Sequence, residues 1–210
     1  SPCCWGPDVC SSDLGRPCVF VRLTGCDLRC SYCDTAYAFT GGETMTLEAI
    51  QNKIAELGEG YPEPPLVELT GGEPLLQKET PALMTTLCDA GFTVLLETSG
   101  AHDISEIDSR VHRIVDLKCP SSGEHEKNLE SNLTNLRPTD ELKCVIGTQE
   151  DYDWAKAQLQ NFHANCEVLF SWVNSLTAEQ QHHALKPVTA DHTPLTSPQL
   201  AESTLPHPQL

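Results

Sequence analysis

Three cysteines near the start of the chain have a spacing that suits metal-cluster chemistry. Cys26, Cys30 and Cys33 form the pattern C-x3-C-x2-C, directly after a strand-like run at 18–24. Thiolates are the usual ligands of iron–sulfur clusters. Three of them on one short loop can hold three corners of a four-iron cubane and leave the fourth iron open. We therefore expect a 4Fe–4S site with room for one further ligand.

A zinc site is the main alternative for these cysteines. Structural zinc needs four ligands in a closed tetrahedron. The sequence has no second C-x2-C pair to complete such a site, although Cys18 or a distant histidine would be possible fourth ligands. The zinc alternative stays open on spacing alone.

The elements that must position this loop alternate along the chain. Strand-like runs lie at 18–24, 66–69, 92–97, 111–117, 141–146 and 166–170. Helix-like segments lie between them, at 47–57 with Thr46 as N-cap, at 81–90 before Gly91, and at 152–162. Such alternation indicates βαβ units. Because a complete eight-stranded barrel takes ~250 residues, we expect an α/β fold: a partial, open TIM-like barrel of about six parallel strands with outer helices.

A glycine-rich motif follows the second predicted strand. It reads Thr70, Gly71, Gly72, Glu73 and Pro74. Paired glycines allow close backbone approach to a ligand, and the glutamate offers an acceptor to an ammonium group. By itself, the motif is more typical of an ordinary strand-to-helix turn.

Polar groups also follow the third and fourth predicted strands. Glu97 to Gly100 (ETSG) ends one strand, and Asp116 to Lys118 (DLK) ends the next. Ser99 suits a ribose or carboxylate, and Lys118 suits a carboxylate, although a solvated surface lysine is the simpler interpretation. Ligands of open parallel sheets collect at the carboxyl ends of strands. All these motifs are therefore expected at one edge.

In this order the motifs resemble the radical S-adenosylmethionine (SAM) superfamily, with Tyr32 at its usual aromatic position. The resemblance implies that Cys26, Cys30 and Cys33 hold a 4Fe–4S cluster whose open iron binds SAM. It also implies a set of SAM contacts. These are Tyr32, Cys33, Asp34, Gly71, Gly72, Glu73, Ser99, Asp116 and Lys118.

A longer stretch, over 15–171, is similar to the 7-carboxy-7-deazaguanine synthase family. The residues that carry it are Gly15-Arg16-Pro17, Phe20 to Cys26, Cys33 to Tyr37, and the later TGGEP, LETSG and DLK. The resemblance implies conversion of 6-carboxy-5,6,7,8-tetrahydropterin to 7-carboxy-7-deazaguanine, with loss of ammonia, in queuosine and deazapurine biosynthesis. It implies a homodimer and an electron donor such as flavodoxin.

The same resemblance assigns roles to three more residues. Thr35 falls on the position of a magnesium ligand, and Arg22 and Thr70 fall on substrate-binding positions. A hydroxyl suits a hard cation, and a guanidinium pairs with a carboxylate. The simpler interpretations are a helix N-cap for Thr35 and a surface salt bridge for Arg22.

Composition limits the partners. The formal net charge of −17 repels phosphate backbones and anionic membranes, so neither nucleic acid nor a membrane is expected as a partner. No apolar run approaches the ~18 residues of a membrane span. The eleven cysteines are an odd number, unlike a secreted disulfide framework. With no signal-peptide pattern at the start, we expect a cytoplasmic protein.

The two ends of the chain differ from the core domain, which we place at 15–171. Residues 8–14 (DVCSSDL) match one reading frame of a common sequencing adapter, so 1–14 are expected to be a non-native or disordered arm. Residues 172–210 carry four prolines among polar residues after 189 and are expected to be a disordered or non-family tail. Neither end matches the substrate-contacting terminal segments of the synthase family.

Three alternatives follow from these observations. One is a glycyl-radical-enzyme activase, another radical SAM protein. A second is a zinc or iron–sulfur binding module without catalysis. The third is an inactive truncated copy that keeps the SAM and cluster motifs but makes no product.

Overall fold

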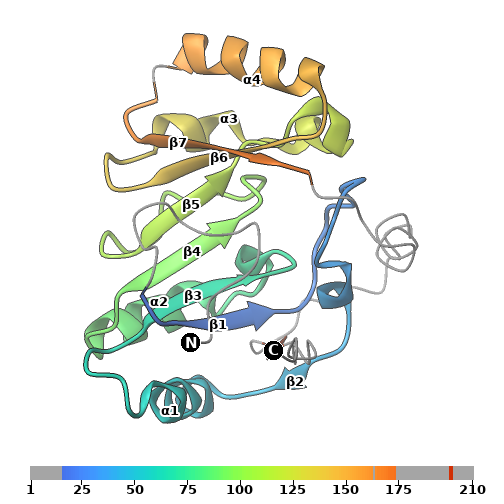
Figure 1. The fold of residues 1–210 in the computed structure, drawn as a ribbon. Helices are drawn as coiled ribbons and strands as arrows, with labels where there is room; N and C mark the ends of the chain where they lie inside the picture. The colour runs from blue at the N-terminus through green and yellow to red at the C-terminus, as the bar shows by residue number, and fades with distance from the viewer. Residues whose placement is uncertain (1–15, 163, 174–198, 201–210) are drawn as a thin grey trace, which may run out of the picture.

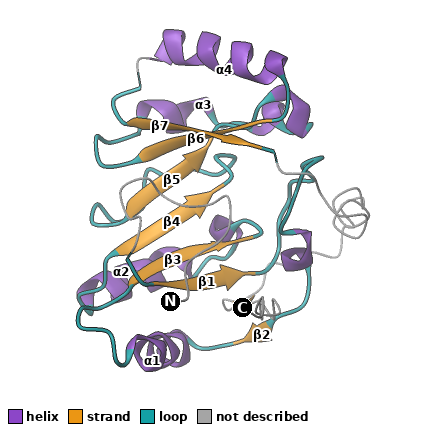
Figure 2. Cartoon of the chain, viewed as in Figure 1, coloured by secondary structure: helices purple, strands orange, loops and turns teal. Residues whose placement is uncertain are grey.

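The computed structural model describes residues 16–162, 164–173 and 199–200. They form an α/β fold in which one sheet is flanked by helices (Figure 1 and Figure 2). The strand order is β2-β8-β1-β3-β4-β5-β6-β7. From β1 to β7 all neighbours in this order pair in parallel, while β8 pairs antiparallel with β1 and β2. The open, parallel arrangement confirms the predicted partial barrel.

All six predicted strands are present, and their ends lie within two residues of the expected positions. Two further strands, of two residues each, were not expected. The strands are β1 (Cys18–Leu23), β2 (Glu43–Thr44), β3 (Leu66–Gly71), β4 (Val94–Thr98), β5 (His112–Asp116), β6 (Glu141–Ile146), β7 (Glu167–Trp172) and β8 (Gln199–Leu200).

The three predicted helices are confirmed as α1 (Leu47–Gly58), α2 (Thr80–Asp89) and α4 (Gln149–Phe162). Thr46 caps α1, since its hydroxyl accepts a hydrogen bond from the backbone N–H of Ala49 at 3.1 Å. Gly91 follows α2 with a positive φ of 89°, as a C′ residue requires. A short helix, α3 (Glu130–Thr134), was not predicted because its five mostly polar residues carry no helical period.

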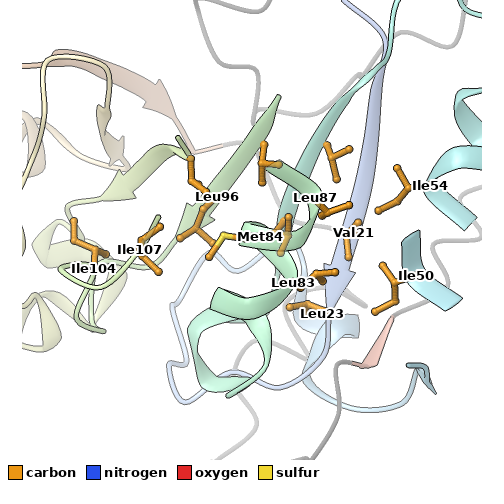
Figure 3. Close-up of a cluster of buried hydrophobic side chains, with 14 of the residues drawn as sticks. Val21, Leu23, Ile50, Ile54, Leu83, Met84, Leu87, Leu96, Ile104 and Ile107 are labelled. Carbon is orange, nitrogen blue, oxygen red and sulfur yellow. The ribbon is translucent and has the colours of Figure 1, made fainter. Parts of the chain in front are cut away.

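The main core lies between the sheet and the helices α1 and α2 (Figure 3). Ile50 and Ile54 come from α1, and Leu83, Met84 and Leu87 come from α2. They pack against alternate residues of the strands, whose other residues face the opposite side of the sheet. Burying each such side chain contributes about 1.5–3 kcal/mol. This layer holds α1 and α2 against the sheet.

A buried ion pair holds the loop before β6. Asp140 and Arg113 are almost fully buried and form an ion pair, and Asp140 also accepts from the backbone N–H of Arg137 at 2.7 Å. Burial alone would raise the pKa of the Asp140 carboxyl, but the two arginines outweigh that effect and lower the pKa. The carboxylate therefore stays charged in the interior.

The expected terminal arms fall largely outside the described residues. This applies to 1–14 and to the tail apart from 172–173 and β8. In the part of the chain that the structure describes, no helix is both long and apolar enough to cross a membrane.

The core generates a stability prediction. Leu96 on β4 is fully buried, so Leu96→Ala should lower the free energy of unfolding by about 2–5 kcal/mol through lost contacts and a cavity. Chemical denaturation followed by circular dichroism measures the change. Leu57→Ala is the matched control, because Leu57 is 51% exposed and its loss should cost under about 1 kcal/mol. Equal losses in the two variants would contradict this placement of the core.

Candidate active site

A pocket opens at the carboxyl-terminal edge of the parallel strands. In Figure 1 the arrowheads of β1, β3, β4, β5 and β6 point toward one side, where the chain leaves β1. Most of the predicted site residues line this pocket. They are Arg22, Cys26, Cys30, Tyr32, Cys33, Asp34, Thr35, Thr70, Gly71, Gly72, Ser99, Asp116 and Lys118.

The cysteine loop, residues 25–35, is held in a compact shape by its own hydrogen bonds. The backbone N–H of Leu28 points at the Cys26 sulfur at 3.4 Å, and the Cys33 N–H donates to the carbonyl of Cys30 at 3.2 Å. Arg29 donates to the carbonyl of Cys26 at 2.8 Å and stacks 4.0 Å from the centre of the Phe39 ring. The loop is therefore ordered around the three thiols.

Burial disfavours the thiolate form of these three cysteines. It raises the pKa of Cys26 to about 12 and that of Cys30 to about 11, and it raises the pKa of Cys33 as well. Metal ions bind the thiolate form. A bound metal centre would therefore supply the positive charge that stabilises the thiolates.

The geometry argues against a single metal ion at this loop. Within the described residues, no group of three or more His, Cys, Asp or Glu side chains converges closely enough to hold one ion. A zinc ion needs all its sulfur ligands about 2.3 Å away, whereas a cubane cluster holds its cysteines at separate corners. The residues present fit a cluster better than zinc.

The two glycines at the end of β3, Gly71 and Gly72, serve backbone packing. A Cβ at Gly71 would lie 2.0 Å from the carbonyl oxygen of Leu23, and one at Gly72 would lie 2.1 Å from that of Gly25. Gly71 also has a φ of 139°. The sequence analysis expected close approach to a ligand. The observed close approach is between the end of β3 and the start of the cysteine loop, with both glycines also at the pocket wall.

Glu73 lies behind that wall and is fully buried. Its carboxylate accepts hydrogen bonds from the backbone N–H groups of Leu75 at 2.9 Å and Ser99 at 2.7 Å, and from the hydroxyl of Thr98 at 2.8 Å. The bonds from Thr98 and Ser99 join the turn after β3 to the end of β4. The expected contact of Glu73 with an ammonium group stays a prediction.

Asp116 and Lys118 form an ion pair at the end of β5, with 2.5 Å between the Lys118 Nζ and an Asp116 carboxylate oxygen. Burial alone would lower the pKa of Lys118, but the Asp116 carboxylate next to it raises the pKa. Lys118 thus keeps its charge and is not a solvated surface lysine. Tyr32 lies nearby, with its hydroxyl 3.5 Å from the carbonyl of Val145.

Arg22, Thr35 and Thr70 lie at another part of the pocket wall. Arg22 on β1 is paired in register with Thr70 on β3, and its guanidinium lies 5.8 Å from the centre of the Tyr37 ring. Thr35 precedes the 3₁₀ helix Ala36–Phe39 as its N-cap residue, but its side chain makes no capping hydrogen bond. Its hydroxyl is 3.9 Å from the Cys33 sulfur.

Two charged residues that the sequence analysis did not assign also line the pocket. Lys143 on β6 is buried, and its Nζ lies 2.5 Å from a carboxylate oxygen of Glu97 on β4. The other oxygen of Glu97 accepts from the Thr70 hydroxyl at 3.0 Å. The signal available in the sequence was a lysine between Leu142 and Cys144, because a charged residue in an apolar strand indicates a polar face of the sheet.

The class of protein follows from comparison with known families. Residues 20–121 match the family described as the Radical SAM superfamily. Together with the open parallel barrel and the three-cysteine loop after β1, this makes the chain a radical SAM protein. A curated 7-carboxy-7-deazaguanine synthase of Chlorobaculum tepidum is 42% identical over 165 residues, which cover 76% of this chain and 73% of that relative. The chain belongs to the 7-carboxy-7-deazaguanine synthase family.

Two further relatives with the same name support this membership. The protein of Koribacter versatilis is 46% identical over 70% of this chain, and that of Methanospirillum hungatei is 39% identical over 75%. The chain spans 63% and 64% of their respective lengths. Membership favours the synthase interpretation over a glycyl-radical-enzyme activase.

Solved structures support the fold. SuiB of Streptococcus suis, in a crystal structure bound to S-adenosylmethionine, superimposes with a TM-score of 0.55 at 12% sequence identity. The match covers 79% of this chain and 42% of that one. At this low identity the match supports the open parallel barrel fold and nothing finer.

The buried Glu73 generates a prediction about the pocket wall. In Glu73→Gln, one acceptor oxygen becomes an N–H donor facing other donors, so the free energy of unfolding should fall by about 1–3 kcal/mol. Thermal and urea unfolding measure it. Glu79→Gln, on the exposed start of α2, should change stability by under about 0.5 kcal/mol. If Glu73→Gln were as stable as the Glu79→Gln control, the two hydrogen bonds from Thr98 and Ser99 would not be what ties the turn after β3 to the end of β4.

Proposed function

We propose that this chain converts 6-carboxy-5,6,7,8-tetrahydropterin to 7-carboxy-7-deazaguanine, with loss of ammonia, as a step of queuosine and deazapurine biosynthesis. The observation that carries the proposal is the three-cysteine loop opening into the strand-end pocket of a chain from this family. The chain spans about two thirds of the length of these relatives, so the complete reaction is proposed for it on the basis of family membership.

Cys26, Cys30 and Cys33 are the proposed ligands of the 4Fe–4S cluster. Their burial, their shared loop and their position at the pocket support the assignment. When bound, the cluster and SAM supply a 5′-deoxyadenosyl radical that takes a hydrogen atom from the substrate. The backbone order of the loop keeps the three thiols ready for the cluster without a large rearrangement.

The SAM molecule is proposed to lie along the ends of β3, β4 and β5. Lys118 remains cationic and suits the carboxylate of SAM, while Asp116 has one buried carboxylate oxygen without a hydrogen-bond partner among the described residues and suits its ammonium group. Ser99 offers a hydroxyl at the same wall. The remaining proposed contacts are Tyr32, Cys33, Asp34, Gly71, Gly72 and Glu73.

The pterin substrate is proposed to lie beside Arg22 and Thr70. The Arg22 guanidinium can pair with the carboxylate of the substrate. Glu97 offers a carboxylate to the N–H groups of the pterin ring, and Lys143 and Thr70 fix its orientation. Lys143 also keeps this wall of the pocket close to neutral.

Three further features complete the proposal. Magnesium would bind the hydroxyl of Thr35 with substrate oxygen and water, since hard cations prefer oxygen ligands. The lack of a capping bond from that hydroxyl supports this role. A one-electron donor such as flavodoxin and a homodimeric state are proposed with the family's activity.

The direct test combines cluster content with product formation. Anaerobically reconstituted protein should show broad visible absorption that dithionite bleaches, and with SAM and carboxytetrahydropterin it should release 7-carboxy-7-deazaguanine, detected by mass spectrometry. Replacing Cys26, Cys30 or Cys33 by Ala should remove both signals, because each thiol holds one iron. Cys88→Ala, whose thiol lies on α2 away from the pocket, is the control and should keep both. A chain with cluster and SAM cleavage but without product would refute the proposed activity.

A second prediction concerns magnesium. Thr35→Ala should retain the cluster and SAM cleavage but lose most of the stimulation of turnover by magnesium, because the protein's proposed ligand is gone. Turnover is measured across a magnesium titration. Thr35→Ser keeps the hydroxyl and should keep the stimulation. An unchanged magnesium response in the alanine variant would refute the role of Thr35.

A further inference from the structure

The cysteine loop is held from outside by the segment that follows Lys118. We call residues 119–124, which include the 3₁₀ helix η4 (Pro120–Ser122), the support segment. The backbone N–H of Ser31 donates to the carbonyl of Ser122 at 2.9 Å, and its hydroxyl donates to the carbonyl of Ser121 at 2.6 Å. Ser31 directly follows Cys30, so these bonds act on the middle cysteine of the motif.

A side chain of the same segment adds another bond. The carboxylate of Glu124 accepts from the backbone N–H of Arg29 at 2.6 Å. The residues on both sides of Cys30 are therefore tied to the support segment. Cys26 and Cys33 lie on stretches held by other contacts, so the support segment mainly fixes where Cys30 lies relative to the other two.

The support segment is in turn held by Asp151 of α4, a fully buried carboxylate. One of its oxygens accepts from the backbone N–H of Ser121 at 2.8 Å. Its other oxygen accepts from the Ser121 hydroxyl and from the backbone N–H groups of Gly147 at 2.8 Å and Thr148 at 3.0 Å. Asp151 thus connects the start of α4 to the segment that contacts the cysteine loop.

Helix capping explains only part of this arrangement. Thr148 and Asp151 form a capping box, in which each side chain accepts from the other residue's backbone N–H. The two bonds to Ser121 lie outside the helix and contribute nothing to capping. Packing is also tight here, since a Cβ at Gly147 would lie 2.7 Å from the Ser121 hydroxyl oxygen. The contact between α4 and the support segment is specific.

We infer that Asp151 and Glu124 are positioning residues for the iron–sulfur cluster: through residues 119–124 they hold Cys30 so that the open iron faces the SAM pocket. The inference rests on the proposed cluster and deepens it. Neither side chain lines the pocket, so both are proposed to act through the backbone of the cysteine loop. The chain Asp151–Ser121–Ser31–Cys30 is the path of this effect.

The test compares two buried aspartates. Asp151→Asn leaves at most one acceptor oxygen for the four donors that now bond to the carboxylate. Asp140→Asn is the control, because it removes one acceptor oxygen from a buried carboxylate that bonds to Arg113 and Arg137, away from the cysteine loop. Both variants should unfold at lower temperature. In reduced, reconstituted protein, SAM binding is followed by its effect on the electron paramagnetic resonance spectrum of the cluster. Only Asp151→Asn should need about tenfold more SAM for that change.

A second pair of variants acts on Arg29. Glu124→Gln keeps an acceptor oxygen for the Arg29 N–H and should behave as the unsubstituted chain does. Glu124→Ala removes it and should weaken the SAM response by about threefold to tenfold. This pair is informative even if Asp151→Asn folds poorly, because Glu124 is only half buried.

Three results would overturn the inference: an unchanged SAM response in both Asp151→Asn and Glu124→Ala, an equal weakening in Asp140→Asn, or an equal weakening in Glu124→Gln. Failure of the proposed activity would be seen separately. In that case the unsubstituted chain gives no deazaguanine product, while the spectra of Asp151→Asn and Asp140→Asn still respond differently to SAM.

Discussion

The close contact between the ends of β1 and β3 is the constraint on which the rest of the site depends. With no Cβ at Gly71 and Gly72, the backbone after β3 lies against the carbonyl groups of Leu23 and Gly25. Gly72 and Glu73 then donate their N–H groups to those carbonyls, at 3.0 Å and 2.8 Å. This contact sets the cysteine loop over the sheet edge. Any side chain at Gly72 would push the loop away from the strand ends that line the pocket.

The sheet has two faces with different tasks. One face supplies the apolar layer against α1 and α2. The other carries Arg22, Thr70, Glu97, Asp116 and Lys143, which reach the pocket from five neighbouring strands. Because burying unpaired charge is costly, Lys143 is paired with Glu97, and Asp116 is paired with Lys118. The polar face thus supplies the polar lining of the pocket, while the apolar face provides most of the stability.

Much of this arrangement can be predicted from the sequence, because strand–helix alternation and the motif order are local signals. Thr46 and Gly91 were placed correctly since caps depend on a few adjacent residues. The partners of Glu73 could not be predicted, since they come from the end of a different strand. Lys143 and Asp151 were missed for the same reason: their roles depend on which strand or loop lies next to them in space.

The order of the site along the chain has a consequence for biosynthesis. All three cysteines have been translated by residue 33, whereas Ser31 and Tyr32 find their partners at Ser121, Ser122 and Val145. A growing chain therefore exposes its thiols long before their supports exist. Parallel strands pair only across long stretches of sequence and form slowly. Cluster insertion that needs a shaped loop therefore has to wait until the strands and loops that supply these partners have been made.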